Sequence, residues 1–357
     1  MIAGLTKRDL EQVIAALAIG LGGGAVFWWL GLPAPWLAGS VVTVAAASLS
    51  GVIKQAMPRH LTKFIFILLG LQIGGAVTPE TLNTLSRWPL SFLILALTMV
   101  VLVWAGVVFF RKVYGWDRAT SYFAVMPGAL SVALALAADT RADLKKVSVS
   151  QVIRLFVLVA VLPSLISSLG ELSDAPPQVL PDPGSLRDLV MVLGAGLVAG
   201  FIFDKLKVPA GLILGPALAS AVMHVGEVVH GTLPMWVLIP VFVFLGTMIG
   251  MRFAGVRPAD IANIGGAGLA GLGVALVVSV AGAAVASAIA DVPFAWTILA
   301  FAPGGMEAMT IMAFALGLDP AFVGAHQIGR FVLIALAMPL VWQFIQQKPG
   351  NTKGSDY

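Results

Sequence analysis

The chain has 357 residues, of which 59% are apolar and 11% are charged, and its formal net charge is +4. A soluble domain carries about 25% charged residues, so this composition indicates a protein embedded in a lipid bilayer. The chain contains no cysteine, which excludes disulfides, thiol nucleophiles and thiolate metal sites.

Apolar segments long enough to enter a bilayer follow one another along the chain. Six of them cover roughly residues 10–30, 35–53, 61–77, 88–110, 119–138 and 148–169, and six equivalents follow 176 positions later. About 20 apolar residues cross the hydrocarbon core as a helix. The sequence therefore predicts an all-α integral membrane protein.

The second half of the chain repeats the first half without gaps, at a constant offset of 176 residues. The recurring pairs include Gly39 and Gly215, Pro58 and Pro234, Leu69 and Leu245, Gly70 and Gly246, Pro127 and Pro303, Gly128 and Gly304, Gln151 and Gln327, and Arg154 and Arg330. A match that preserves glycines, prolines and an arginine within an apolar segment indicates an internal duplication.

The distribution of Lys and Arg favours five crossings and one re-entrant hairpin in each repeat. If all twelve segments crossed, the two sides would carry 11 and 8 basic residues. If the fifth segment of each repeat re-enters, 17 lie on one side, and only Arg87 and Arg187 lie on the other. Cytoplasmic loops are enriched in basic residues, so the second arrangement is favoured. An odd number of crossings inverts the second repeat relative to the first.

This topology divides the chain into four parts in a bacterial inner membrane, with both termini cytoplasmic. We expect a first membrane repeat over 1–170, a periplasmic connector over 171–186, a second membrane repeat over 187–346 and a cytoplasmic tail over 347–357. The basic residues are scattered over short loops, which argues against a nucleic-acid partner.

A break near the centre of each fifth segment gives the hairpin a local cause. Pro127 and Gly128 interrupt the first of these segments, and Pro303, Gly304 and Gly305 interrupt the second. Proline cannot continue a helix, and glycine permits a sharp reversal. About eight residues on either side, at 1.5 Å each, reach roughly the midplane of the bilayer. The alternative is an ordinary proline-kinked helix.

Two arginines of the sixth segments are candidates for binding a solute. Arg154 and Arg330 lie well inside their segments, where a charge usually marks a functional position. Gln151 and Gln327 lie one turn earlier on the same helix face. A pair of guanidinium groups suits a carboxylate or phosphate. The alternative is a structural role, in which carbonyl oxygens at a hairpin tip or an internal acid satisfy each arginine.

Glu307 and His326 are the candidates for a coupling role. Glu307 replaces Ser131 of the first repeat and lies inside the second hairpin. Such a carboxylate could carry a coupling proton or ligate sodium, or it could neutralise one of the two arginines. His326 is adjacent to Gln327.

Catalytic constellations and cofactor motifs are absent from the sequence, so we expect no enzyme and no resident cofactor or metal. There is no phosphate-binding loop and no nucleophile elbow, and the histidines lack metal-ligand spacing. The four histidines are His60, His224, His230 and His326.

Several stretches resemble the membrane AbrB family. They are Leu32 to Gly39, its repeat Val208 to Gly215, Ala302 to Met309, and His326 to Arg330. The resemblance implies a duplicated bacterial membrane domain, whose members carry the labels ammonia monooxygenase or AbrB regulator. A copper oxygenase would need clustered histidines, and a DNA-binding regulator would need a soluble basic module. The sequence shows neither.

Inverted repeats with hairpins are similar to the fold of elevator-type secondary transporters, an analogy that does not by itself establish function. The leading hypothesis is a secondary transporter or exporter of a small solute, with an anion favoured, bound between the two hairpin tips. The same analogy suggests a homodimer. The alternative is a membrane-embedded AbrB-type protein that affects gene expression indirectly, and an ammonia monooxygenase is disfavoured.

Overall fold

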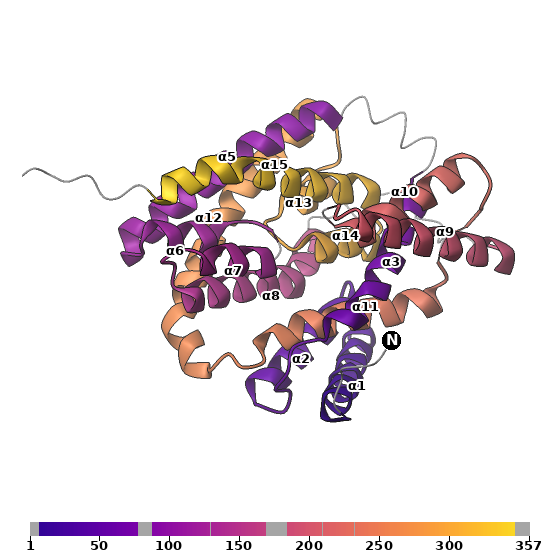
Figure 1. Cartoon of the computed structure of the whole chain (residues 1–357), viewed down its shortest axis with the longest axis horizontal. Helices are drawn as coiled ribbons and strands as arrows, with labels where there is room; N and C mark the ends of the chain where they lie inside the picture. Colours follow the sequence, from indigo (N-terminus) through magenta and orange to yellow (C-terminus); the bar gives the residue numbers. More distant parts are fainter. Residues whose placement is uncertain are drawn as a thin grey trace, which may run out of the picture.

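The computed structural model describes residues 7–77, 88–128, 130–168, 184–208, 210–231 and 233–346, and within these ranges the chain is helical with no strand (Figure 1). The first half contains α1 (Lys7–Trp29), α2 (Pro35–Leu49), α3 (Arg59–Gly75), α5 (Trp88–Tyr114), α6 (Arg118–Val125), α7 (Leu130–Ala138) and α8 (Leu144–Ser168). The second half contains α9 (Leu186–Lys205), α10 (Gly211–Val225), α11 (Met235–Gly250), the short 3-10 turn η2 (Met251–Phe253), α12 (Pro258–Ala290), α13 (Phe294–Phe301), α14 (Met306–Ala315) and α15 (Pro320–Gln346). The predicted all-α architecture is confirmed.

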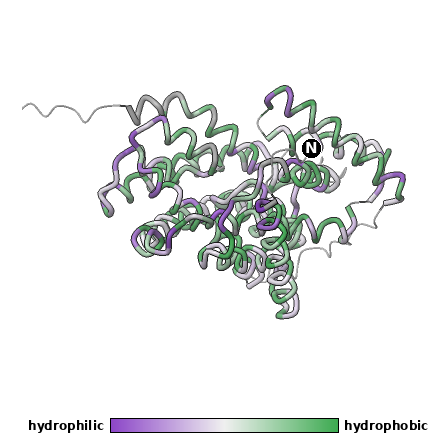
Figure 2. Tube along the Cα trace, turned by 60° about the horizontal axis from the view of Figure 1, so that its bottom comes forward, coloured by the Kyte–Doolittle hydropathy of each residue, from purple (hydrophilic) through white to green (hydrophobic). Residues whose placement is uncertain are grey.

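Seven helical segments in the described ranges are long and apolar enough to cross a membrane. They belong to α1, α5, α8, α9, α11 with η2, α12 and α15. Apolar residues run along most of the helical length, and hydrophilic residues gather mainly at turns and helix ends (Figure 2). The chain is therefore an integral membrane protein. Ten crossings would also need α2, α3 and α10, which have only 15, 17 and 15 residues, so the count of ten stays a prediction.

The two halves have the same order of helices, with matching boundaries. Helix α2 spans Pro35–Leu49 and α10 spans Gly211–Val225, which is a displacement of 176 residues at both ends. Helices α6 and α13 are displaced by the same 176 residues. The internal duplication is thus visible in the helix boundaries. The predicted connector lies outside the described residues up to residue 183, and the predicted tail, 347–357, lies wholly outside them.

Close backbone contacts join the halves in repeat-equivalent pairs, with α3 on α10 and α11 on α2. A Cβ atom on Gly74 of α3 would clash with Ala217 of α10, and a Cβ on Gly250 of α11 would lie 2.7 Å from Val44 of α2. Small residues let helix backbones approach closely inside a bilayer. The two halves therefore interlock rather than forming two separate bundles.

Both fifth segments are broken at the predicted proline–glycine positions. Helix α6 ends at Val125 and α7 begins at Leu130, while α13 ends at Phe301 and α14 begins at Met306. Gly128 has a φ of +144°, a conformation open essentially to glycine alone.

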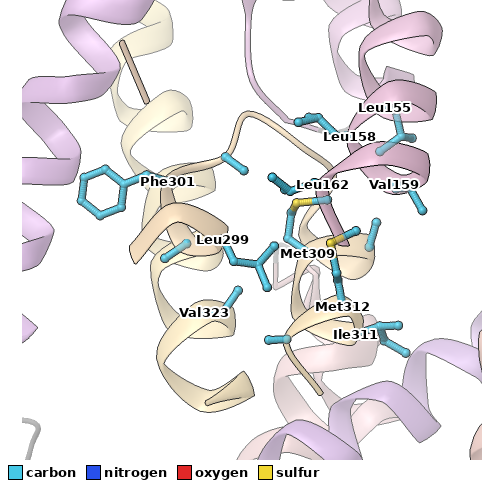
Figure 3. Packing of buried hydrophobic residues seen from close by; sticks show 14 of the residues in the cluster. Leu155, Leu158, Val159, Leu162, Leu299, Phe301, Met309, Ile311, Met312 and Val323 are labelled. Atoms are coloured by element: carbon cyan, nitrogen blue, oxygen red, sulfur yellow. The ribbon is translucent and has the colours of Figure 1, made fainter. Parts of the chain in front are cut away.

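The second hairpin packs inside the main hydrophobic core. In Figure 3 the chain passes along α13 through Leu299 and Phe301, turns, and returns along α14 through Met309 and Met312. Phe301, Met309 and Met312 are fully buried, so these methionines fill the core. That the hairpins re-enter the membrane from opposite faces stays a prediction.

Candidate functional site

Arg154 and Gln151 bind the broken end of the first hairpin. The last carbonyl groups of α6 have no partner within their own helix. The Arg154 Nη1 atom donates to the Val125 carbonyl oxygen at 3.0 Å, and its Nη2 donates to that of Met126 at 3.2 Å. Gln151 Nε2 donates to the Phe123 carbonyl oxygen at 2.6 Å. The positive charge of Arg154 therefore lies at the negative end of the α6 dipole.

Arg330 and Gln327 repeat this arrangement on the second hairpin. The Arg330 Nη1 atom donates to the Ala302 carbonyl oxygen at 2.5 Å, and its Nη2 donates to that of Gly304 at 2.7 Å. Gln327 Nε2 donates to the Leu299 carbonyl oxygen at 3.1 Å, and Gln327 Oε1 accepts from Arg330. The geometry thus supports the structural alternative for Arg330, which is only 1% exposed.

The two hairpin tips meet at a small cavity. Its volume is about 20 Å³, close to the space that one water molecule needs. Its lining consists of Gly128, Leu130, Gln151, Arg154, Leu155, Arg252, Pro303, Gly304, Gly305 and Glu307. Residues from both tips therefore line one space.

Arg154, which lines this cavity, has one side-chain nitrogen without a hydrogen-bond partner in the described part of the chain. Its Nε atom is buried and has no hydrogen-bond partner among the described residues. Arg154 therefore holds the hairpin with its terminal nitrogens and has one N–H group left for another ligand.

Arg252 is the residue that the sequence reasoning missed. Arg252 is one of the 17 basic residues that the predicted topology assigns to the cytoplasmic side, but it lies in η2, directly after α11, and lines the cavity together with Glu307. One sequence signal could have found it. The repeat equivalent of Arg252 is Ala76 and that of Glu307 is Ser131, so both charges break the internal symmetry.

The electrostatics of the cavity favour an anion. Arg154 and Arg252 line it, Arg330 lies directly behind the second tip, and Glu307 is the one acidic residue in the lining. Glu307 lies within electrostatic reach of Arg252 and Arg330. Helices α7 and α14 begin at the tips, so their N-terminal N–H groups add positive potential there.

His326 does not reach the cavity. Its Nδ1 atom lies 2.8 Å from the Phe322 carbonyl oxygen, so Nδ1 carries the proton that this bond needs, and Nε2 lies 2.8 Å from the Ser91 hydroxyl. The ring stacks on Phe92 with centroids 4.2 Å apart. A neutral imidazole satisfies both contacts, so the geometry gives a coupling role no support.

The other predicted residues divide between the cavity and its surroundings. Those in the lining are Gly128, Gln151, Arg154, Pro303, Gly304, Gly305 and Glu307. Pro127, Gln327, Arg330 and His326 lie outside the lining. Among the described residues, no three His, Asp or Glu side chains form a group that could hold a metal ion.

A larger cavity of about 200 Å³ lies elsewhere, near Asp188, Ser220 and His224. None of the predicted site residues lines it. We assign the candidate site to the hairpin tips because charges and helix ends converge there, whereas Ser220 and His224 already bond to backbone carbonyl oxygens.

These features define a class of protein, a duplicated helical membrane protein in which two broken-helix hairpins meet tip to tip. The chain matches the family model "Transition state regulatory protein AbrB" over residues 36–346, and it belongs to that family. It is 29% identical over 335 residues to "Putative regulator AbrB" of Escherichia coli (strain K12), covering 88% of this chain and 90% of that protein. It is 25% identical over 382 residues to "Uncharacterized protein YhjN" of Bacillus subtilis (strain 168), covering 97% of each. The resemblance inferred from the sequence motifs is thus confirmed.

Proposed function

We propose that this protein is a secondary transporter or exporter of a small anion, which binds between the two hairpin tips. One observation carries the proposal. A single cavity is lined by both tips, by Arg154 and Arg252, and by one carboxylate.

Each residue has a distinct role in this proposal. Arg252 and the free Nε–H group of Arg154 attract and bind the anion, and the N-termini of α7 and α14 add backbone N–H donors. Arg330 and Gln327 keep the second tip in place through its carbonyl oxygens. Glu307 supplies the coupling group, binding either a proton or sodium.

The size of the cavity bears on the transport cycle. About 20 Å³ accommodates a water molecule but not an organic anion. Solute binding therefore requires the tips to separate. Each tip is a break between short helices, so it can move without unwinding a long helix.

The names of the family and of the Escherichia coli relative refer to regulation. A membrane-embedded chain could affect gene expression indirectly, by changing the concentration of a signalling anion on one side of the membrane. The proposal therefore accommodates a regulatory effect without a nucleic-acid partner.

The test is ligand-induced thermal stabilisation of the purified protein in detergent. The probes are acetate, succinate, phosphate and sulfate, with choline and glycerol as cationic and neutral controls. A ligand that binds the folded state alone raises stability by RT ln(1 + [L]/Kd). We expect at least one anion to raise the melting temperature of the wild type. The same anion should have a much smaller effect on Arg252→Ala. Equal stabilisation of both proteins by every probe would overturn the proposed site.

A further inference from the structure

Gln72 of α3 carries a buried side-chain amide. It is 4% exposed, and neither its Oε1 nor its Nε2 atom has a hydrogen-bond partner among the described residues. Within that part of the chain, it is the one side chain with two such atoms. Burying an amide without hydrogen bonds is unfavourable, so a buried amide normally bonds to protein or to ordered water.

Gln72 lies on α3 between residues that line two different cavities. Leu69 lines a cavity of about 10 Å³ that Glu307 and Thr310 also line. Gly75 lines the larger cavity of about 200 Å³. Ile73 also lines the smaller cavity, and Leu71 also lines the larger one. Gln72 therefore lies on α3 between the residues that line the two cavities.

The nearby polar groups of the larger cavity are engaged with backbone atoms. The Ser220 hydroxyl donates to the Leu71 carbonyl oxygen at 2.9 Å. The two ring nitrogens of His224 lie 2.7 Å from the carbonyl oxygens of Ser220 and Gly231. These contacts account for Ser220 and His224 and leave the Gln72 amide to another partner.

The internal duplication places an apolar residue at the equivalent position of the other half. The repeat equivalent of Gln72 is Met248, and that of Glu307 is Ser131. A buried amide and a carboxylate therefore occur together in one half, whereas a thioether and a hydroxyl occupy the equivalent positions in the other. Gln72 and Glu307 are thus both specific to one half of the duplication. This indicates that the two residues act together, and that Gln72 is not part of the helix packing common to both halves.

We propose that Gln72 binds water and forms the polar link between the larger cavity and the cavity beside Glu307. The link gives the Glu307 carboxylate contact with water along α3. The purpose of this water link rests on the coupling role that the proposed function assigns to Glu307. The presence of water at Gln72 does not depend on that role.

The test uses single cysteines, because the chain contains none of its own. Gln72→Cys is compared with Met248→Cys, which places a cysteine at the equivalent, buried position of α11. Each folded variant is treated with 2-aminoethyl methanethiosulfonate and then unfolded. The remaining thiols are counted by a gel shift with maleimide–polyethylene glycol.

We expect the cysteine at position 72 to react at least about tenfold faster than the cysteine at position 248, because thiols react as thiolates in contact with water. Equally slow reaction of both would overturn the proposal. No solute is present in this measurement. The labelling can therefore contradict the water link while the thermal screen still supports anion binding, and the labelling can support the link while the screen contradicts anion binding.

A second variant keeps the test decisive if Gln72→Cys does not fold. Gln72→Met installs the residue of the equivalent position. Replacing a dry, unpaired amide by an apolar group of similar size raises stability, whereas removing an amide that binds water does not. A melting temperature clearly above that of the wild type would therefore contradict the proposal, and an unchanged or lower one would support it.

Discussion

Arg154 and Arg330 stabilise the broken ends of the two hairpins. Each guanidinium group donates to carbonyl oxygens at the end of a half-helix, where the helix leaves acceptors without partners. Few other side chains can supply several donors in a fixed fork together with a positive charge. The arginines therefore stabilise the hairpins independently of any ligand.

A substitution at Arg330 tests this structural role. Arg330→Gln should lower the free energy of unfolding by about 1–3 kcal/mol, because buried carbonyl groups lose their donors. The measurement is the melting temperature in detergent without any added anion. Arg111→Gln, at an exposed position near the end of α5, is the control and should leave it unchanged. Equal melting temperatures for the wild type and Arg330→Gln would show that the hairpin does not depend on this residue.

A substitution at Arg252 tests anion binding separately from the stability of the hairpins. Arg252 is not among the side chains that cap the hairpin carbonyl oxygens, so Arg252→Ala should keep the melting temperature of the anion-free protein. Loss of one charged contact should weaken anion binding about tenfold, which corresponds to roughly 1.4 kcal/mol. Titration calorimetry with the anion found in the thermal screen measures this. A variant that binds as tightly as the wild type would exclude Arg252 from the site.

At the scale of elements, the hairpin tips depend on glycine at defined positions. Gly128 adopts a φ of +144°, and a Cβ atom on Gly304 would lie 2.7 Å from the end of Met309. The first constraint is conformational and the second is steric. The clash at Gly304 can be relieved by moving a flexible methionine, so Gly128 is the stricter requirement.

The prediction at this scale concerns Gly128→Ala. It should lower the free energy of unfolding by about 1–3 kcal/mol, because an L-residue is strained at this φ. The matched control is Gly194→Ala in α9, where a Cβ atom would meet nothing within 4 Å. This control should be neutral or stabilising by up to about 1 kcal/mol, because alanine favours a helix over glycine. Equal effects of the two substitutions on thermal unfolding would contradict a tip that depends on glycine.

At the scale of the whole molecule, the interlocked repeats set the geometry of the site. Helices α2 and α11 pack as α10 and α3 do, so the second half reproduces the contacts of the first. If the repeats are inverted, the two hairpins enter from opposite faces, and their tips can meet only near the midplane. A site at that depth can open alternately to either side.

Labelling of single cysteines tests the inversion. Asp139→Cys follows the first hairpin and Pro293→Cys precedes the second, and both positions are exposed. The first should react with a membrane-impermeant maleimide only from the cytoplasmic side, and the second only from the periplasmic side. The wild-type chain provides the unlabelled control, because it has no cysteine. Periplasmic labelling at position 139 would mean that α6 and α7 together cross the membrane, and that the repeats are parallel.

The sequence by itself determined the helical membrane class, the duplication, and the broken segments at Pro127 and Pro303. These features depend on local properties. Hydropathy decides which segments enter the bilayer, and proline and glycine decide where a helix stops, so both can be recognised without knowing which helices are neighbours.

Only the tertiary structure decided which charges meet. It placed Arg252 in the cavity, put His326 among aromatic rings, and turned the arginine side chains towards hairpin carbonyl oxygens. It also left the amide of Gln72 buried, without a hydrogen-bond partner in the part of the chain that the structure describes. These outcomes depend on contacts between helices that are distant in the chain, such as α3 with α14 or α8 with α12. A polar residue in an apolar segment shows that a partner is needed, but only packing determines what that partner is.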